Sequence, residues 1–224
     1  LPNFHNPAGI TESLERRQYI VELAVRYGVF LVEDDPYGEL RFEGEDITPL
    51  VVMHKENTFY LSTFSKTLAP GLRLGWLVAP EAIMVKFIQA KQGMDLHTST
   101  FVQMIAADIM ERGILRQHVK KIRQAYRERR DAMLRALEAY FPEGITWTRP
   151  QGGLFLWVQM PEQVDADELL RAAIEERVAF VPGHAFYPDG RGRNTMRLNF
   201  SNAQPDRIEE GIRRLGKAVR RLLG

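Results

Sequence analysis

The sequence predicts an α/β fold: part of a mainly parallel sheet with helices on both faces, followed by a smaller α+β region. In the first half, short apolar runs alternate with amphipathic helical patterns, and this alternation favours a parallel sheet covered by helices. A long helical pattern covers 114–140, and strand-like segments mix with helices beyond it. We therefore expect a domain boundary near residue 120, which gives regions 1–120 and 121–224.

The elements of the first region follow from local periodicity. Apolar residues at helical spacing predict an amphipathic helix from Thr11 to about Tyr27. The expected strands of this region are 29–32, 58–61 and 74–79. Its other expected helices are 81–92 and 99–112.

The second region changes to an α+β pattern. The expected strands are 145–148, 154–158, 179–181 and 196–200, and the expected helices are 165–176 and 206–223. In the last helix, Ile208, Ile212 and Leu215 begin an apolar stripe, which indicates a helix docked on the domain rather than a nucleic-acid or membrane surface. Gly152 and Gly153 are expected to permit a close backbone approach.

Composition excludes several classes of protein and site. The chain is 45% hydrophobic and 26% charged, and its net charge of +1 gives no electrostatic attraction to nucleic acid. No apolar run approaches the roughly 18 residues of a membrane span, and no signal-peptide pattern is present. With 0 cysteines, a disulfide framework and thiolate metal sites are excluded, and the five histidines show no metal-ligand spacing, so we expect no metal.

The segment around Lys66 indicates chemistry on an aldehyde cofactor that carries a phosphate. It reads STFSKTLAPGLRLGW from residue 62, so one lysine is framed by hydroxyls, a Pro-Gly turn and an arginine seven positions later. A lysine amine can form a Schiff base with a carbonyl. Short hydroxyl side chains and an arginine fork bind phosphate oxygens. The alternative is a surface lysine beside a loop.

Three further motifs support this interpretation. The run FLVEDDPY at 30–37 is typical of a buried strand that ends in a loop with two acids and a phenol, and parallel strands deliver functional groups at their carboxyl ends. The turn NPAG at 6–9 precedes the first expected helix. The run MRLNFS at 196–201 places an arginine inside an alternating strand, where a buried guanidinium needs an anionic partner.

With these four motifs in this order, the chain resembles the fold-type I pyridoxal 5'-phosphate (PLP) aminotransferases over nearly its whole length. The similarity is to the branch with 2-aminoadipate, kynurenine and aromatic aminotransferases, which also contains the aminotransferase-like domains of GntR/MocR-type transcription regulators. The resemblance implies the PLP-dependent transferase fold, with 1–120 as part of the PLP-binding large domain and 121–224 as the small domain. It also implies PLP as the cofactor.

The resemblance implies a role for each motif residue. Lys66 would be the lysine that forms the Schiff base, Asp34 the partner of the pyridine nitrogen and Tyr37 a donor to the cofactor's phenolic oxygen. Asn6 would contact the same oxygen and the substrate side of the site, and Arg197 would bind the substrate's α-carboxylate. The remaining cofactor-binding residues would hold the phosphate: Thr63, Ser65 and Arg73.

Elementary chemistry supports these roles. An aspartate against the ring nitrogen raises the pKa of that nitrogen and keeps it protonated. Asp35 is the rival of Asp34 for this role, but Asp34 has the family spacing to Tyr37 and Asp35 precedes Pro36. The amine of Lys66 is suited to carry a proton at the substrate's α-carbon, and two parallel hydrogen bonds from Arg197 would fix the substrate's orientation.

Two other polar segments are expected to be structural. The loop 92–99 gathers Asp95, His97 and Ser99, but linear proximity does not supply the geometry of a nucleophilic triad, and we expect an N-cap with polar loop partners. His184 is expected to be a loop residue near the substrate pocket rather than a catalyst.

Three functions remain open from the sequence. The first is an aminotransferase that exchanges an amino group between an L-amino acid and a 2-oxo acid, with an aromatic, branched-chain or 2-aminoadipate donor and 2-oxoglutarate as acceptor. The second is the effector-sensing domain of a transcription regulator, which would contact nucleic acid only through an amino-terminal helix-turn-helix domain. The third is another PLP reaction, β-elimination or decarboxylation, because the cofactor-binding residues do not dictate which bond breaks.

The chain starts at Leu1, and no Gly-rich turn or ring-stacking aromatic residue precedes Asn6. Members of the resembled family supply both from an amino-terminal portion. We therefore expect these residues to be the carboxyl-terminal part of a longer protein. We also expect that protein to be a cytoplasmic homodimer that does not bind membranes.

Overall fold

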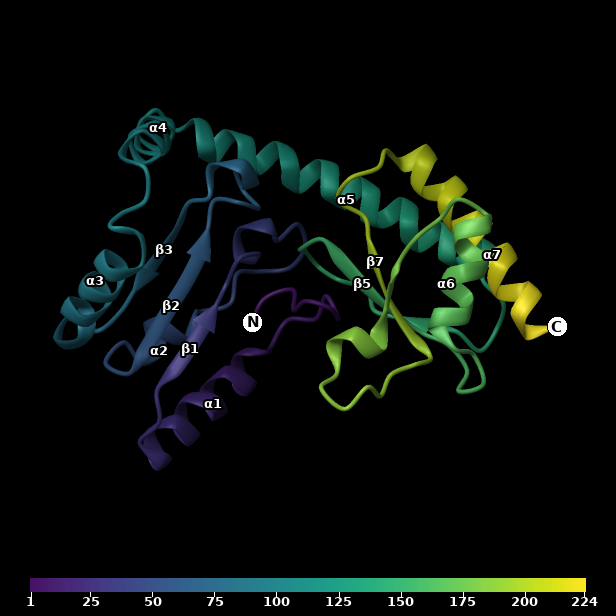
Figure 1. Cartoon of the computed structure of the whole chain (residues 1–224), viewed down its shortest axis with the longest axis horizontal. Helices are drawn as coiled ribbons and strands as arrows, with labels where there is room; N and C mark the ends of the chain where they lie inside the picture. The colour runs from purple at the N-terminus through teal and green to yellow at the C-terminus, as the bar shows by residue number, and fades with distance from the viewer. The chain divides into compact units, whose positions relative to one another are not determined.

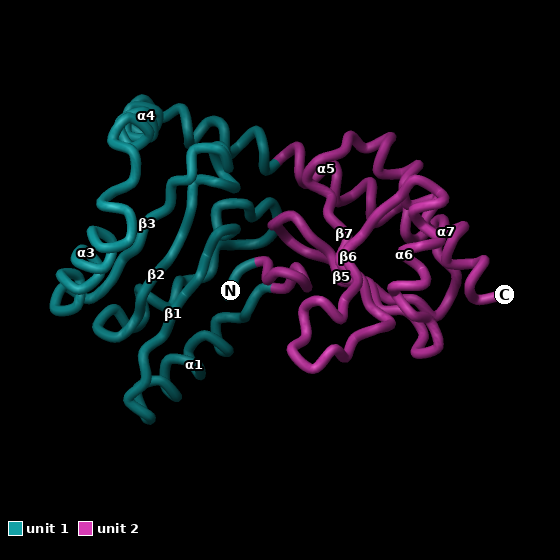
Figure 2. Tube along the Cα trace, viewed as in Figure 1, with its two compact units in different colours: residues 1–3, 11–123 teal, residues 4–10, 124–224 magenta.

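The computed structural model describes residues 1–224, and these divide into two compact units. Unit 1 contains residues 1–3 and 11–123, and unit 2 contains residues 4–10 and 124–224 (Figure 2). The expected boundary near residue 120 is close to this division, whereas the assignment of 4–10 to the second unit was not expected. That the units are the large and small domains of the fold stays a prediction.

Unit 1 is a three-stranded sheet with helices (Figure 1). Its strands, in the order β1-β2-β3, are β1 (Leu31–Asp34), β2 (Thr58–Thr63) and β3 (Gly75–Val78). Its helices are α1 (Leu14–Tyr27), α2 (Leu50–Met53), α3 (Glu81–Asp95) and α4 (Thr100–Glu111), with short 3-10 turns η1 (Gly38–Leu40) and η2 (Pro70–Leu72). The long helix α5 (Ile114–Tyr140) begins in unit 1 and ends in unit 2.

Local signals explain where α1 begins and ends. The Oγ of Ser13 accepts a hydrogen bond from the N–H of Arg16 at 3.2 Å, so the helix begins after this cap rather than at Thr11. Gly28 has φ 61° and its N–H donates to the carbonyl of Ala24, which ends the helix in the left-handed conformation that glycine adopts without strain.

The sheet of unit 1 mixes two kinds of pairing. Strands β1 and β2 are parallel, whereas β2 and β3 are antiparallel, so the expected parallel arrangement holds for only one of the two pairs. Strand β1 starts and ends two residues later than expected. Asp34 is therefore the last residue of a strand rather than a loop residue, and its side-chain direction is fixed by the pleat.

Unit 2 is built on an antiparallel sheet in the order β4-β5-β7-β6. The strands are β4 (Thr146–Trp147), β5 (Phe155–Gln159), β6 (Val181–Pro182) and β7 (Thr195–Asn199). The helices are α6 (Ala166–Glu175) and α7 (Pro205–Leu223), and the 3-10 turn η3 covers Gly183–Phe186. Asp165 caps α6 by accepting from the N–H of Asp167 at 2.8 Å, and Pro205 starts α7 where no N–H is needed.

The core of unit 2 is well buried. One face of its sheet carries Leu156, Val158 and Met196, each 0% exposed. Helix α7 buries the expected apolar stripe with Leu215 and Val219, also 0% exposed. Because α6 and α7 also pack on each other, the docked-helix interpretation of the last helix is confirmed. No helix of the structure is both long enough and apolar enough to cross a membrane.

Candidate active site

The connection from β2 to β3 gathers the hydroxyls that flank Lys66. The Oγ1 of Thr63 lies 2.9 Å from the Oγ of Ser65 and 3.0 Å from the carbonyl oxygen of Leu74, and it accepts the N–H of Ser65 at 3.0 Å. Lys66 is half-buried in the same turn. Two hydroxyls are thus held side by side where the strand ends.

Arg73 lies in the same connection, after the 3-10 turn η2. Its backbone adopts the left-handed conformation with φ 52°, which is uncommon for a residue with a side chain. Its Nη1 donates to the carbonyl of Pro70 at 3.2 Å, and the side chain is exposed. The guanidinium is therefore accessible to an anion.

The register of the sheet separates Asp34 from Asp35. Asp34 is paired with Leu61, two residues before Thr63, so Asp34 and Thr63 lie on the same face. Asp34 is exposed on that face, together with Val32. Asp35 follows the strand toward the opposite face and is buried. The two neighbouring acids therefore face different environments.

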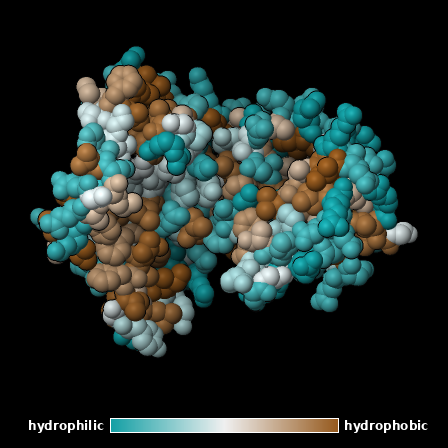
Figure 3. All heavy atoms as spheres, in the orientation of Figure 1, coloured by the Kyte–Doolittle hydropathy of each residue, from teal (hydrophilic) through white to brown (hydrophobic).

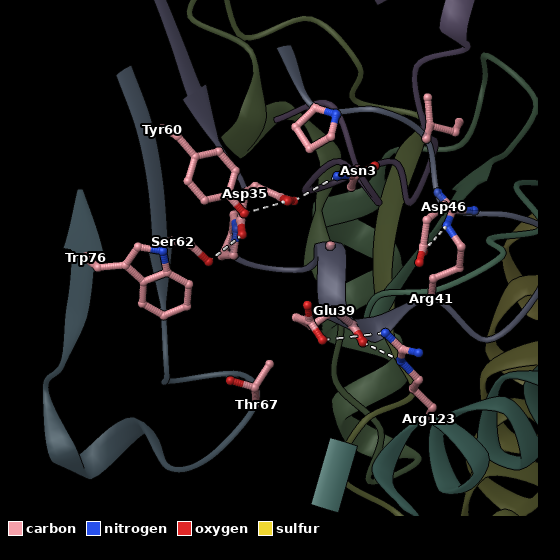
Figure 4. Close-up of a pocket in the computed structure, with 14 residues that line it drawn as sticks. Asn3, Asp35, Glu39, Arg41, Asp46, Tyr60, Ser62, Thr67, Trp76 and Arg123 are labelled. Atoms are coloured by element: carbon pink, nitrogen blue, oxygen red, sulfur yellow. Dashed lines mark hydrogen bonds and ion pairs between the residues drawn. The ribbon is translucent and has the colours of Figure 1, made fainter. Parts of the chain in front are cut away.

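The carboxylate of Asp35 is already occupied by protein partners (Figure 4). Its oxygens accept from the Nδ2 of Asn3 at 3.0 Å and from the hydroxyl of Tyr60 at 3.1 Å. Burial, together with the adjacent Asp35, raises the pKa of Tyr60, so this phenol stays a hydrogen-bond donor. These groups line a cavity of about 240 Å³, whose other polar walls include the ion pairs of Arg41 with Asp46 and Arg123 with Glu39.

Sequence reasoning missed the buried arginine that donates to Asn3, a residue of this cavity's wall. Arg17 is 0% exposed, and its Nη2 donates to the Oδ1 of Asn3 at 2.5 Å and to the carbonyl of Pro2 at 3.2 Å. Its Nη1 and Nε donate to further backbone carbonyls. Burial lowers the pKa of Arg17, although Glu33 and Asp35 oppose this effect. Nothing in the sequence distinguishes Arg17 from its exposed neighbour Arg16.

Tyr37 and Asn6 belong to different units. Tyr37 is buried at the start of η1 in unit 1. Asn6 lies in unit 2, where its Oδ1 accepts from the Nη1 of Arg197 at 2.7 Å. The structure thus brings the amino-terminal turn and the strand arginine together across 191 positions of sequence.

The other polar segments have ordinary partners. Asp95 is in helix α3, not in a loop, and pairs with Lys91 at 2.8 Å. The Nδ1 of His97 lies 2.9 Å from the carbonyl oxygen of Thr98. The Nε2 of His184 lies 3.0 Å from the Oδ1 of Asp167.

Gly153 permits the close approach expected for the 152–153 pair. It has φ 71°, and a Cβ there would lie 2.5 Å from the Cβ of Phe4. This segment is therefore pressed against the amino-terminal turn within unit 2.

Several known proteins are similar to this chain in sequence over nearly its whole length. Aromatic-amino-acid aminotransferase 1 of Thermococcus litoralis is 46% identical over 98% of this chain and 53% of its own length. The 2-aminoadipate transaminase of Thermus thermophilus is 40% identical over 100% of this chain and 57% of its own. The transcriptional regulator YisV of Bacillus subtilis is 36% identical over 100% of this chain and 46% of its own. The chain thus spans about half the length of the curated relatives it matches.

Solved structures extend the similarity to the fold. Kynurenine aminotransferase of Pyrococcus horikoshii, in complex with PMP, superposes with a TM-score of 0.96 at 46% identity, over 100% of this chain and 55% of its own. LysN of Thermus thermophilus, an α-aminoadipate aminotransferase, superposes with a TM-score of 0.95 at 40% identity, over 100% of this chain and 58% of its own. The expected PLP-dependent transferase fold is confirmed. The family model for class I and II aminotransferases matches residues 1–215, and the chain belongs to that family.

Proposed function

We propose that the protein is a PLP-dependent aminotransferase that moves an amino group between an L-amino acid and a 2-oxo acid. One observation carries this proposal: the acid Asp34 and the hydroxyl of Thr63 lie on one face of the sheet, and the turn with Ser65 and Lys66 directly follows Thr63 at the end of β2. The names of the relatives support an aromatic or 2-aminoadipate donor, and the leucine adduct bound in the LysN structure supports a branched-chain donor. We propose 2-oxoglutarate as the acceptor.

The residues of the β2–β3 connection fit the cofactor's phosphate. Thr63 and Ser65 offer two adjacent hydroxyls, and the exposed guanidinium of Arg73 offers a charged fork. Asn6 and Tyr37 would donate to the phenolic oxygen. Asp34 would hold its negative charge against the ring nitrogen, and its exposure on the Thr63 face supports this role.

Lys66 would anchor the cofactor and move a proton at the substrate's α-carbon. The bound cofactor supplies an electron sink for the pair left at that carbon when the proton departs. A half-buried amine at the end of a strand can be held close to the reacting atom, and such positioning is a large part of acid–base catalysis.

Arg197 would bind the α-carboxylate of the substrate. The Nη1 of Arg197 donates a hydrogen bond to the Oδ1 of Asn6. A carboxylate can accept two parallel hydrogen bonds from the edge of a guanidinium. Such a contact orients every amino acid in the same way, so selectivity among side chains would lie elsewhere.

A regulator is the second candidate, because a transcriptional regulator matches the whole chain at 36% identity. The enzyme is favoured by the higher identity of 46% to a named aminotransferase. The gene upstream of Leu1 discriminates between them. A basic helix-turn-helix pattern there would mark a regulator, and a Gly-rich loop without one would mark an enzyme.

We also propose a cytoplasmic homodimer. The support is the exposed apolar surface of unit 1, since extensive patches of this kind mark protein contacts. The 224-residue chain alone is expected to associate, to bind PLP weakly and to show no transamination. A monomer that binds PLP tightly and turns over an amino acid would refute this.

The test of the proposed function replaces Lys66 by alanine in the intact gene product. Transamination is expected to fall about a thousandfold or more, because both anchor and proton carrier are lost. Lys86→Ala, on the exposed surface of α3, is the matched control and should retain activity. Equal activity of the Lys66 and Lys86 variants would reject the proposal.

A further inference from the structure

The sheet of unit 2 presents two aromatic residues and an arginine on one face. Arg197 in β7 lies directly opposite Trp157 in β5, and Phe155 is two residues from Trp157, so the three share a face. The opposite face carries the apolar core of the unit. The pleat therefore directs Arg197 away from the core and beside aromatic rings.

Two phenylalanine rings contact the guanidinium of Arg197. Its Cζ lies 4.2 Å from the ring centroid of Phe155 and 5.0 Å from that of Phe186. Contacts of this length between a guanidinium and a ring are attractive and restrict the tilt of the planar group. The Nη1 bond to Asn6 at 2.7 Å restricts rotation within the plane.

Phe186 reaches Arg197 from a turn that is itself held in place. The turn η3 begins at Gly183, where a Cβ would lie only 1.8 Å from the Oγ1 of Thr195, so the turn is packed directly on the start of β7. The ring of Phe186 packs edge-on against Trp157, with centroids 5.8 Å apart.

A side-chain contact ties the same turn to helix α6. The Nε2 of His184 lies 3.0 Å from the Oδ1 of Asp167, in the first turn of that helix. Arg193 forms ion pairs with Asp167 and with the nearby Asp165: its Nη2 lies 2.7 Å from the Oδ2 of Asp165 and 3.6 Å from the Oδ2 of Asp167. The turn that carries Phe186 is thus fixed at the strand and at the helix.

We propose that Phe186 is a positioning residue that, with Phe155, sets the plane of the Arg197 guanidinium for a substrate carboxylate, and that the contact of His184 with Asp167 holds Phe186 in place. The proposal rests on the proposed function. A carboxylate binds a guanidinium through its edge, in the plane of the N–H bonds. Rings against the face of the group fix that plane before the substrate arrives, so less ordering is needed on binding.

The kinetic test compares three variants in the intact, PLP-loaded gene product. Phe186→Leu removes the ring, Phe186→Tyr keeps it, and Phe141→Leu is a control that removes a ring packed on Trp147 elsewhere in unit 2. Phe186→Leu should raise KM about tenfold for every amino acid with little change in kcat. Phe186→Tyr and Phe141→Leu should each keep KM close to its wild-type value. A rise no larger than that of Phe141→Leu, or no recovery with tyrosine, would overturn the proposal.

An NMR measurement on the intact gene product without cofactor tests the contact independently of activity. The Nε–H signal of Arg197, assigned by its loss in Arg197→Lys, should show an aromatic ring-current shift. Phe186→Leu should move it, Asp167→Asn should move it less, and Phe141→Leu should not. If the chemical shift of the Arg197 Nε–H is the same in Phe186→Leu as in the wild type, the proposal is overturned, whatever the kinetic assay shows.

The two arms separate this inference from the proposed function. If the intact gene product turns over no amino acid, the proposed function fails, and the inference is then decided by titrating the Arg197 signal with 2-oxoglutarate. Wild-type protein should respond at about tenfold lower 2-oxoglutarate than Phe186→Leu. Equal responses would reject the positioning role.

Discussion

Unit 1 and unit 2 differ in how well they bury their apolar side chains. All but three of the large apolar side chains that are exposed lie in unit 1; the exceptions are Ile10, Ile174 and Leu222. Figure 3 shows an extended apolar area over unit 1, and smaller apolar areas among hydrophilic atoms over unit 2. Helix α3 buries no residue, whereas α7 buries six.

The proposed chemistry is divided in the same way. Lys66, Asp34 and the hydroxyls of Thr63 and Ser65 are in unit 1, on and beside a sheet face on which no side chain is fully buried. Arg197 and Asn6 are in unit 2, where one face of the sheet packs in a fully buried apolar core. Under the proposed function, substrate recognition would therefore be built on the unit with the better buried core, and the catalytic groups would lie on the unit with the more exposed apolar surface.

After Lys66→Ala, the largest effect is expected from Asp34. Asp34→Asn should lower kcat about a hundredfold without unfolding the protein, because a neutral amide no longer favours a protonated ring nitrogen. Asp35→Asn should instead lower the melting temperature, since it disturbs the bonds to Asn3 and Tyr60. Steady-state kinetics and thermal unfolding of both variants check this. A damaging Asp35→Asn with a mild Asp34→Asn would reverse the assignment.

A smaller change, confined to recognition, is expected from Arg197→Lys. The charge remains but the two-point fork is lost, so KM should rise roughly tenfold or more, by a similar factor for every amino acid tested. Kinetics with aromatic, aliphatic and acidic amino acids provide the measurement. A loss restricted to acidic amino acids would place Arg197 in the side-chain pocket instead.

Core substitutions compare the two units in stability. Leu215→Ala in unit 2 should cost about 2–5 kcal/mol of unfolding free energy because the side chain is fully buried. Val32→Ala in unit 1 should cost less than about 0.5 kcal/mol, since Val32 is 61% exposed. Urea unfolding of the 224-residue chain, at a protein concentration low enough to keep it monomeric, measures both. Similar costs would show that Val32 is covered in solution.

The smallest effect concerns pH and Glu33. Burial is the largest influence on this carboxyl and raises its pKa, against the N–H groups of Val51 and Leu50, which lower it. The native state therefore binds the proton more tightly than the unfolded state, and the contribution of Glu33 to stability falls as pH rises from the ordinary carboxyl pKa through the raised native pKa. Glu33→Gln should gain stability relative to wild type between pH 4 and pH 7. A constant difference across that range would contradict the raised pKa.

Much of this account could be predicted from sequence where the signal is local. The hydroxyls around Lys66 and the apolar stripe of α7 are contiguous or periodic patterns, and the strands of unit 2 were predicted to within a few residues. The shift of β1 was missed because a short apolar run does not mark its own ends. Buried Arg17 and the rings at Arg197 were missed because their partners are distant in sequence.

The central claim is that Lys66 is the residue to which the cofactor is attached. The direct measurement is borohydride reduction of the PLP-loaded gene product, followed by proteolysis and mass spectrometry of the labelled peptide. The account predicts a single phosphopyridoxyl group on Lys66, absent from Lys66→Ala. A label on another lysine, or a label that persists in that variant, would contradict it.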